Sequence, residues 1–122
     1  MGGKLIVKDC EYFRETASKY LQVPAIAKSL AEFIAAKQAN PIAPYGASDK
    51  SNPVGTPMTK YIPKIRHAHL NRDVSVFYTI SGNPAELKLY AILSHDDAGT
   101  GQPTNPKRQT GIAKKLNNQN FN

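Results

Sequence analysis

The 122-residue chain has a single cysteine, no tryptophan and only two methionines. One cysteine, Cys10, cannot form an intramolecular disulfide or a multi-cysteine metal site, which favours a reducing compartment such as the cytoplasm. Apolar runs in the sequence stay far below the roughly 20 residues of a membrane-spanning helix, and the start lacks the apolar region of a signal peptide. The sequence therefore predicts a soluble, cytoplasmic protein without a membrane partner.

Acidic side chains are also scarce, with 9 Asp and Glu against 16 Lys and Arg, so the formal net charge is +7. Residues 58–122 hold nine basic and four acidic side chains, and residues 1–57 hold seven and five. A basic excess favours a polyanionic partner such as RNA, DNA or an acidic protein segment. The length predicts a single domain, residues 1–122, with one hydrophobic core.

Hydrophobic periodicity predicts a strand and two helices in the first third of the chain. Residues 4–8 form a short apolar run typical of a strand, and Asp9 suits the N-cap of a helix over residues 10–21. A second helix is predicted from Pro24 to about residues 38–40, with an apolar stripe on one side and Lys37 turned outward. Both patterns are typical of helices that cover a sheet.

Residues 41–63 are rich in Pro, Gly, Ser and Asn and predict a long surface loop, in which Tyr45, Lys50 and Lys60 are available to nucleic acid. Strands are predicted at 62–70, 74–80 and 87–94, followed by a basic, partly irregular segment at 98–122 with a short helix at 107–116 and a frayed tail. This order predicts an α+β fold, β-α-α-β-β-β, with an antiparallel sheet carrying two helices on one face.

The predicted hairpins define two faces of this sheet. With residues 71–73 as a turn, His67 lies opposite Phe77 and His69 opposite Ser75; pairing of Ser81 with Glu86 would place Tyr90 opposite Phe77. One face would then carry the apolar residues that the helices cover. The other face would carry imidazoles and aromatic rings, a mixture that suits single-stranded RNA because bases stack on rings and imidazoles transfer protons near neutral pH.

The histidines and the charged residues near the sheet also have interpretations other than RNA binding and catalysis. His67 and His69 can be half-buried strand residues, and a His-x-His pair can bind a metal ion together with His95 or Asp96. The spacing alone does not specify such a site, so we expect neither a metal ion nor a cofactor. Basic residues near the sheet can be ordinary solvated charges, and Asp96 and Asp97 can simply cap a turn. The side chains predicted to bind RNA are Lys60, Lys64, Phe77, Lys88, Tyr90, Lys107 and Arg108.

The segments 32–37, 65–70, 73–78 and 89–97 together resemble ParE-like toxins of type II toxin-antitoxin systems, within the RelE/ParE superfamily. The His-Ala-His-Leu segment at 67–70 is also similar to that of YafO-type interferases. The resemblance covers residues 4–101. It implies a RelE/ParE-like fold, a cognate antitoxin and cleavage of mRNA, usually on the ribosome. The positions that match the variable active sites of the superfamily are Arg66, His67, His69, Arg72, Tyr78 and His95.

The hypothesis from the sequence is therefore an endoribonuclease in which a ribose 2′-hydroxyl attacks the adjacent phosphorus. Such a reaction needs a base, an acid and cations around the phosphorane. We expect His67 or His69 as the base, the other one or His95 as the acid, and Arg66 and Arg72 as the cations. Residues after Asn117 lack the Arg, Tyr or His that several RelE-type enzymes carry near their end, so the acid stays open. A ParE-type gyrase poison and a non-catalytic nucleic-acid-binding module are the alternatives.

Overall fold

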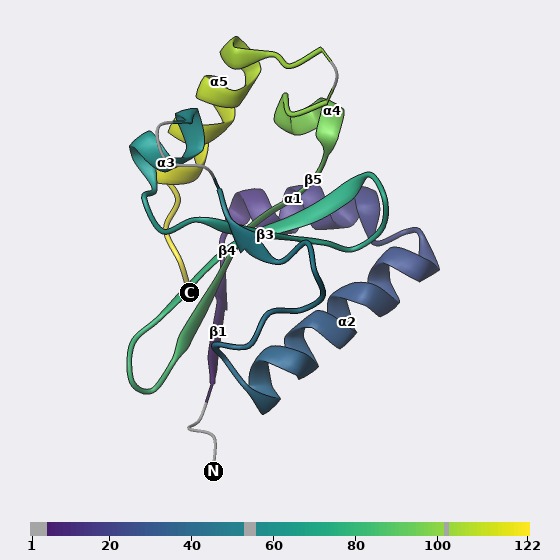
Figure 1. Cartoon of the computed structure of the whole chain (residues 1–122), viewed down its shortest axis with the longest axis vertical. Coiled ribbons are helices and arrows are strands. Elements are labelled where there is room, and N and C mark those ends of the chain that lie inside the picture. The colour runs from purple at the N-terminus through teal and green to yellow at the C-terminus, as the bar shows by residue number, and fades with distance from the viewer. Residues whose placement is uncertain (1–4, 53–55, 102) are drawn as a thin grey trace.

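The computed structural model describes residues 5–52, 56–101 and 103–122. These form a mixed α+β fold with five strands and five helices (Figure 1). Lys4 of the first predicted strand, residues 53–55 of the predicted loop and Gln102 lie outside the described residues. The elements in chain order are β1 (Ile6–Asp9), α1 (Glu11–Tyr20), α2 (Pro24–Ala39), β2 (Lys50–Ser51), α3 (Pro57–Tyr61), β3 (Arg66–His69), β4 (Val74–Ser81), β5 (Glu86–Ser94), α4 (His95–Ala98) and α5 (Pro106–Asn117).

The five strands form one sheet in the order β1-β5-β4-β3-β2. Strands β2 to β5 pair antiparallel with their neighbours, but β1 pairs parallel with β5. The prediction of an entirely antiparallel sheet was therefore wrong. The direction of an edge strand depends on how the intervening chain returns to it, and the apolar pattern of residues 4–8 carries no information about that return.

The β3–β4 hairpin has the predicted register, with His67 opposite Phe77 and His69 opposite Ser75. Strand β5 begins in the predicted register as well, with Glu86 opposite Ser81, but an irregularity between Phe77 and Tyr78 then shifts it by one residue. Phe77 lies opposite Ala91 and not Tyr90, so the predicted pairing beyond this point was wrong. A β-bulge places one extra residue on one strand and turns all later side chains of that strand to the other face.

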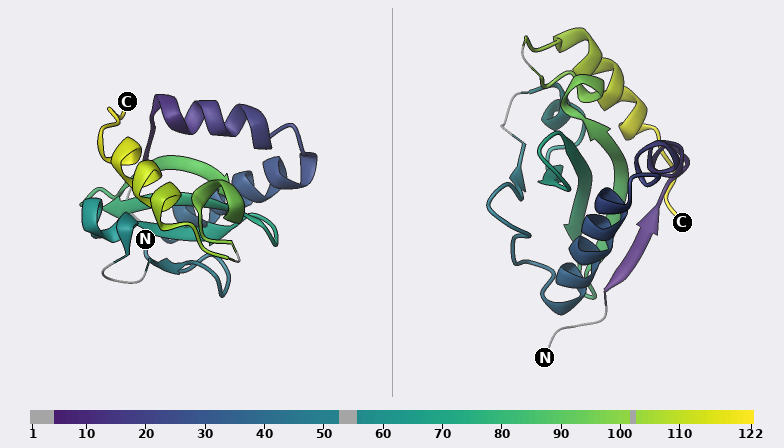
Figure 2. Two further views of the ribbon diagram at one scale, coloured as in Figure 1. Left: turned by 90° about the horizontal axis from the view of Figure 1, so that it is seen from above. Right: turned by 90° about the vertical axis from the view of Figure 1, so that its right-hand side faces the viewer.

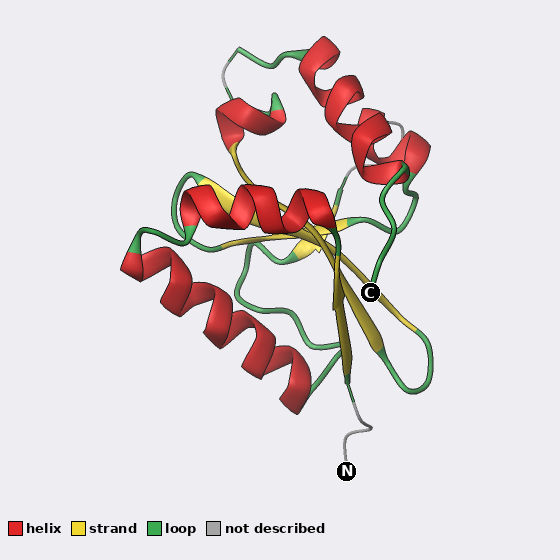
Figure 3. Cartoon of the chain, turned by 180° about the vertical axis from the view of Figure 1, so that it is seen from behind, coloured by secondary structure: helices red, strands yellow, loops and turns green. Residues whose placement is uncertain are grey.

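Helix α1 covers the edge of β5 beyond residue 89, where β5 has no pairing with β1. Strand β1 pairs only with residues 86–89 of β5. Beyond them, the backbone N–H of Ile92 donates to the Thr16 hydroxyl at 3.0 Å, and that of Ser94 donates to the Tyr20 hydroxyl at 3.3 Å. Seen from behind, α1 crosses the strands at this place (Figure 3). The helix begins after Cys10, which occupies the N-cap predicted for Asp9.

Helix α2 covers the face of the sheet that carries Tyr78. Its predicted apolar residues Ile26, Leu30 and Phe33 are buried, and the Phe33 ring packs edge-on against the ring of Tyr78 at 5.0 Å. Lys37 is only 1% exposed, so its predicted outward orientation was wrong. The reason is an ion pair that the helical pattern does not show.

The predicted loop at 41–63 contains two regular elements, β2 and α3. The basic helix predicted at 107–116 is confirmed as α5, and it lies with α3 at one end of the sheet (Figure 1). Residues after α5 run back to the junction of β1 and α1 (Figure 2), where the backbones of Asn122 and Asp9 exchange hydrogen bonds of 3.0 and 3.3 Å. The tail is therefore paired, and the prediction that it is frayed was wrong.

Candidate functional site

Three histidines lie in a row on the face of the sheet opposite α2. His67 and His69 alternate along β3 and therefore project from the same face, and His95 begins α4 directly after β5. The ring centres of His67 and His69 are 6.1 Å apart, and those of His69 and His95 are 5.3 Å apart. We call these three residues the histidine row. The β3–β4 pairing and the helical cap at Ser94 together bring them into contact.

Polar neighbours orient both ends of the histidine row. Nδ1 of His67 lies 2.7 Å from Oδ1 of Asn52, so the ring donates its Nδ1–H to this amide oxygen and leaves Nε2 as an acceptor. His95 donates its backbone N–H to the carbonyl of Asp73 at 2.9 Å, and its Nδ1 lies 3.5 Å from the carboxylate of the same residue. Each end therefore has one ring nitrogen held and the other available for a proton transfer.

The electrostatics of His67 and His69 favour neutral imidazoles. Burial lowers the pKa of His67, and the nearby charges of His69 and Lys50 lower it further. Burial also lowers the pKa of His69, with His95 and Lys50 acting in the same direction. An imidazole that is neutral at neutral pH can accept a proton, so His67 has both the free nitrogen and the protonation state of a general base.

A cavity of about 350 Å³ adjoins the row. His67 and His95 belong to its walls, as do the ring of Phe77 and the side chain of Met58 from α3. Lys50 and Asn52 reach it from the β2 edge, and Gln109 reaches it from α5. Phe77 was predicted on this face. The roles of Asn52 and Gln109 were missed, because the pairing of β2 and the packing of α5 bring them here and their own sequence context gives no signal.

Two residues predicted to be catalytic, Arg66 and Tyr78, lie on the opposite face beneath α2. Tyr78 is fully buried and donates a hydrogen bond to Asp49, and burial raises the pKa of its hydroxyl. Arg66 donates Nε–H to the Tyr78 hydroxyl at 3.1 Å and Nη2–H to the Asp49 carbonyl at 3.1 Å. Lys37 completes this buried network with an ion pair to Asp49 at 2.7 Å. The structure does not bring Arg66 or Tyr78 to the histidines.

The remaining predicted residues are dispersed. Arg72 is exposed in the β3–β4 turn, next to the Asp73 that contacts His95. Nζ of Lys88 lies 5.4 Å from the ring centre of Phe121, and Tyr90 is buried with its ring 4.6 Å from the same ring, so both belong to packing around the C-terminal tail. The predicted RNA contacts that are exposed at the surface away from this tail are Lys60, Lys64, Lys107 and Arg108.

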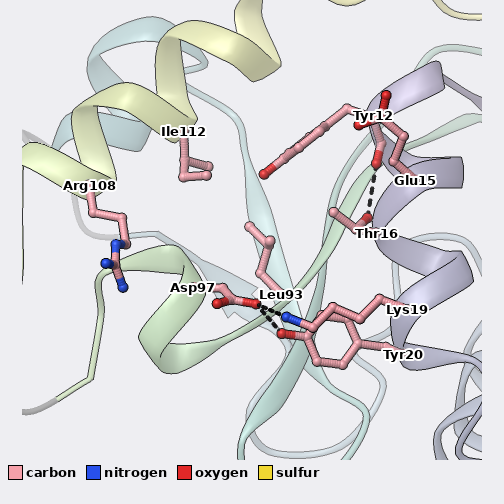
Figure 4. Close-up of a pocket in the computed structure, with 9 residues that line it drawn as sticks. All are labelled: Tyr12, Glu15, Thr16, Lys19, Tyr20, Leu93, Asp97, Arg108 and Ile112. Carbon is pink, nitrogen blue, oxygen red and sulfur yellow. Dashed lines mark hydrogen bonds and ion pairs between the residues drawn. The ribbon is translucent and has the colours of Figure 1, made fainter.

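A second cavity, of about 390 Å³, lies between α1 and α5 (Figure 4). Its polar groups are mostly engaged with one another: Asp97 accepts hydrogen bonds from Tyr20 and, at 3.0 Å, from Lys19. The bond from Tyr20 lowers the pKa of Asp97 against the effect of burial, and Lys19 adds to the lowering. Arg108 donates to the carbonyl of Asp96 at 2.9 Å. These contacts brace α1 against α4, and we assign this cavity no role in catalysis.

Within residues 5–52, 56–101 and 103–122, His, Cys, Asp and Glu side chains do not form a group of three or more placed to hold a metal ion. In the same ranges no helix is long and apolar enough to cross a membrane. Comparison with known proteins gives no match. Neither family models, curated proteins nor solved structures match the chain.

Proposed function

We propose that the chain is an endoribonuclease that cleaves RNA by attack of a ribose 2′-hydroxyl on the adjacent phosphorus, without needing a metal ion. The observation that carries the proposal is the histidine row, with two of its members in the walls of one cavity. The imidazoles of His67 and His95 line the same cavity, so a phosphodiester bound there can contact both. A base and an acid on one phosphodiester are what this reaction requires.

The geometry favours one assignment of roles. His67 accepts the proton of the 2′-hydroxyl at Nε2, the 2′-oxygen bonds to phosphorus, and the leaving 5′-oxygen takes a proton from His95. The products are a 2′,3′-cyclic phosphate and a 5′-hydroxyl end. Lys50 supplies a cation in the cavity wall, and it replaces Arg66 in that role because Arg66 is engaged with Asp49 and Tyr78.

The biological setting of this proposal rests on the resemblance of residues 4–101 to RelE/ParE-type toxins. We propose that the substrate is mRNA, engaged on the ribosome, and that a cognate antitoxin neutralises the chain. The finer RelE/ParE-like fold belongs to this proposal. The exposed side chains of Lys60, Lys64, Lys107 and Arg108 would contact the phosphates of the nucleic acid.

Cleavage of a synthetic mRNA by the purified chain, with and without purified ribosomes, tests the proposal, alongside a matched mRNA that carries a 2′-deoxy sugar at the cleaved linkage. We expect cyclic-phosphate products from the first RNA and none from the second. His67→Gln and His95→Gln should each reduce kcat/KM about 10²–10⁴-fold, the usual contribution of a general acid or base. Lys28→Ala, an exposed charge change on α2, is the control.

The pH profile provides an independent check of the base. The value of kcat/KM should decrease at acidic pH as His67 becomes protonated. Because the pKa of His67 is lowered, the midpoint of this decrease should lie below about pH 6.5, the ordinary histidine value. Full activity in His67→Gln and His95→Gln would contradict the mechanism.

Mapping of mRNA 5′ ends after induced expression tests the proposed biological setting. Growth arrest with intact mRNA would favour the alternative that the chain is a gyrase poison. Unaltered growth without RNA cleavage would favour a non-catalytic nucleic-acid-binding module.

A further inference from the structure

The cavity beside the histidine row has both apolar and polar walls. Its apolar walls come from Phe77, which is 4% exposed, and Met58, which is 1% exposed. At about 350 Å³ it falls at the lower end of the roughly 300–1,000 Å³ usual for small-molecule sites. An enclosed apolar wall beside catalytic groups is a place where an unstacked base can be held against a ring.

Gln109 presents a fixed amide to this cavity. Its Nε2–H donates to the carbonyl of Gly99 at 2.8 Å, which fixes the orientation of the side chain. Gly99 ends α4 with φ +79°, and a Cβ atom there would lie 2.7 Å from the Asn105 carbonyl and 3.1 Å from Cγ of Gln109. Only glycine therefore permits this close approach of α4 and α5. The amide keeps one N–H and the lone pairs of Oε1 for a ligand.

We propose that this cavity binds one unpaired nucleobase of the RNA, next to the cleaved phosphodiester, and that Gln109 determines which base is preferred. The inference rests on the proposed function for its substrate. An amide with one donor and one acceptor matches the N7 edge of adenine, which offers an acceptor at N7 and a donor at N6, better than the same edge of guanine, which offers two acceptors at N7 and O6. The ring of Phe77 supplies the apolar contact that every base can make.

The test measures kcat/KM on four RNAs that differ only in the base beside the cleaved linkage. We expect a marked preference among the four in the wild type. Gln109→Leu, which keeps the size of the side chain, should reduce the ratio between the best and worst base by about 5- to 150-fold, the value of one bidentate base contact. Lys114→Ala, an exposed change on the same helix, should leave the ratio as it is. Equal ratios in the wild type and Gln109→Leu would overturn the inference.

A binding measurement separates this inference from the proposed function. The four nucleoside 3′-monophosphates are titrated into the labelled chain, and the methyl signal of Met58 and the ring signals of Phe77 report on the cavity. Base-selective shifts that disappear in Gln109→Leu would support the cavity site even if the chain cleaved no RNA. Cleavage that is indifferent to the neighbouring base, together with unselective titrations, would overturn the base site and leave the cleavage mechanism intact.

Discussion

Asp49 is the buried anion that ties the segment between α2 and β2 to the rest of the molecule. Its side chain is fully buried and pairs with Lys37 at 2.7 Å and with Arg66 at 3.4 Å. Replacing Asp49 by Asn keeps the shape but leaves the ammonium of Lys37 buried without its counter-charge. We expect a loss of about 3–5 kcal/mol in the free energy of unfolding, measured by urea denaturation at pH 7.

The control for this prediction is Glu32→Gln, the same chemical change at an exposed position of α2, which should alter stability by at most about 0.5 kcal/mol. Burial would raise the pKa of Asp49, but hydrogen bonds from Lys37 and Tyr78 outweigh it and lower that pKa. The stabilisation is therefore complete above the ordinary Asp value of about 3.9 and is lost as the pH falls through the lower, folded value. A variant as stable as the wild type at pH 7 would contradict the buried pair.

This network also shows why the burial of Lys37 and the position of Arg66 and Tyr78 away from the histidines could not be predicted from the sequence. The apolar stripe of α2 correctly placed Ile26, Leu30 and Phe33 in the core, but the same helical period assigned Lys37 to the solvent. Its burial depends on Asp49, twelve residues away in a segment with no period of its own. The predicted register of β3 and β4 places Arg66 opposite Tyr78, as observed, but their shared face belongs to this network and not to the histidines.

At the scale of the elements, side chains of α1 accept the hydrogen bonds that a neighbouring strand would accept from β5 beyond residue 89. The Thr16 hydroxyl accepts the backbone N–H of Ile92, a group that would otherwise be buried without a partner. Thr16→Val keeps the shape of the side chain and removes the acceptor. We expect a loss of about 1–3 kcal/mol in the free energy of unfolding and faster hydrogen exchange at the Ile92 amide.

Ser18→Ala is the matched control on the same helix, because its hydroxyl donates only to the carbonyl of Glu15 at an exposed position. It should change neither the Ile92 exchange rate nor the stability by more than about 0.5 kcal/mol. If Ile92 exchanged at its wild-type rate in Thr16→Val, α1 would not be the element that protects this edge of β5.

The elements themselves were predictable where a local pattern determines them. The helical period predicted α1 and α2, and alternation with turn residues predicted the β3–β4 hairpin and its register. The bulge in β5 was not predictable, because Leu89, Tyr90 and Ala91 form an uninterrupted apolar run in which either face is acceptable. The parallel direction of β1 and the elements β2 and α3 depend on contacts between distant segments, which no local pattern records.

For the whole molecule, the +7 charge predicts binding to RNA that weakens steeply with salt, since cations on the protein release counterions from the phosphates. The structure indicates which lysines an RNA bound over the histidine row would contact. Lys50 lies in the wall of the cavity beside the histidine row, whereas Lys28 is exposed on α2, which covers the opposite face. RNA that lies over the histidines would contact the first lysine and not the second.

The measurement is the binding constant for a non-cleavable, 2′-deoxy-substituted strand over a range of salt concentrations. Lys50→Ala should reduce the slope of log K against log salt by about 0.7, the value for one phosphate contact on a single strand. Lys28→Ala removes the same charge from the same net total and should leave the slope unchanged. If both variants reduced the slope equally, binding would follow the overall charge of the chain and not the face of the sheet. A reduction confined to Lys50→Ala would place the RNA backbone beside the histidine row, independently of any measurement of cleavage.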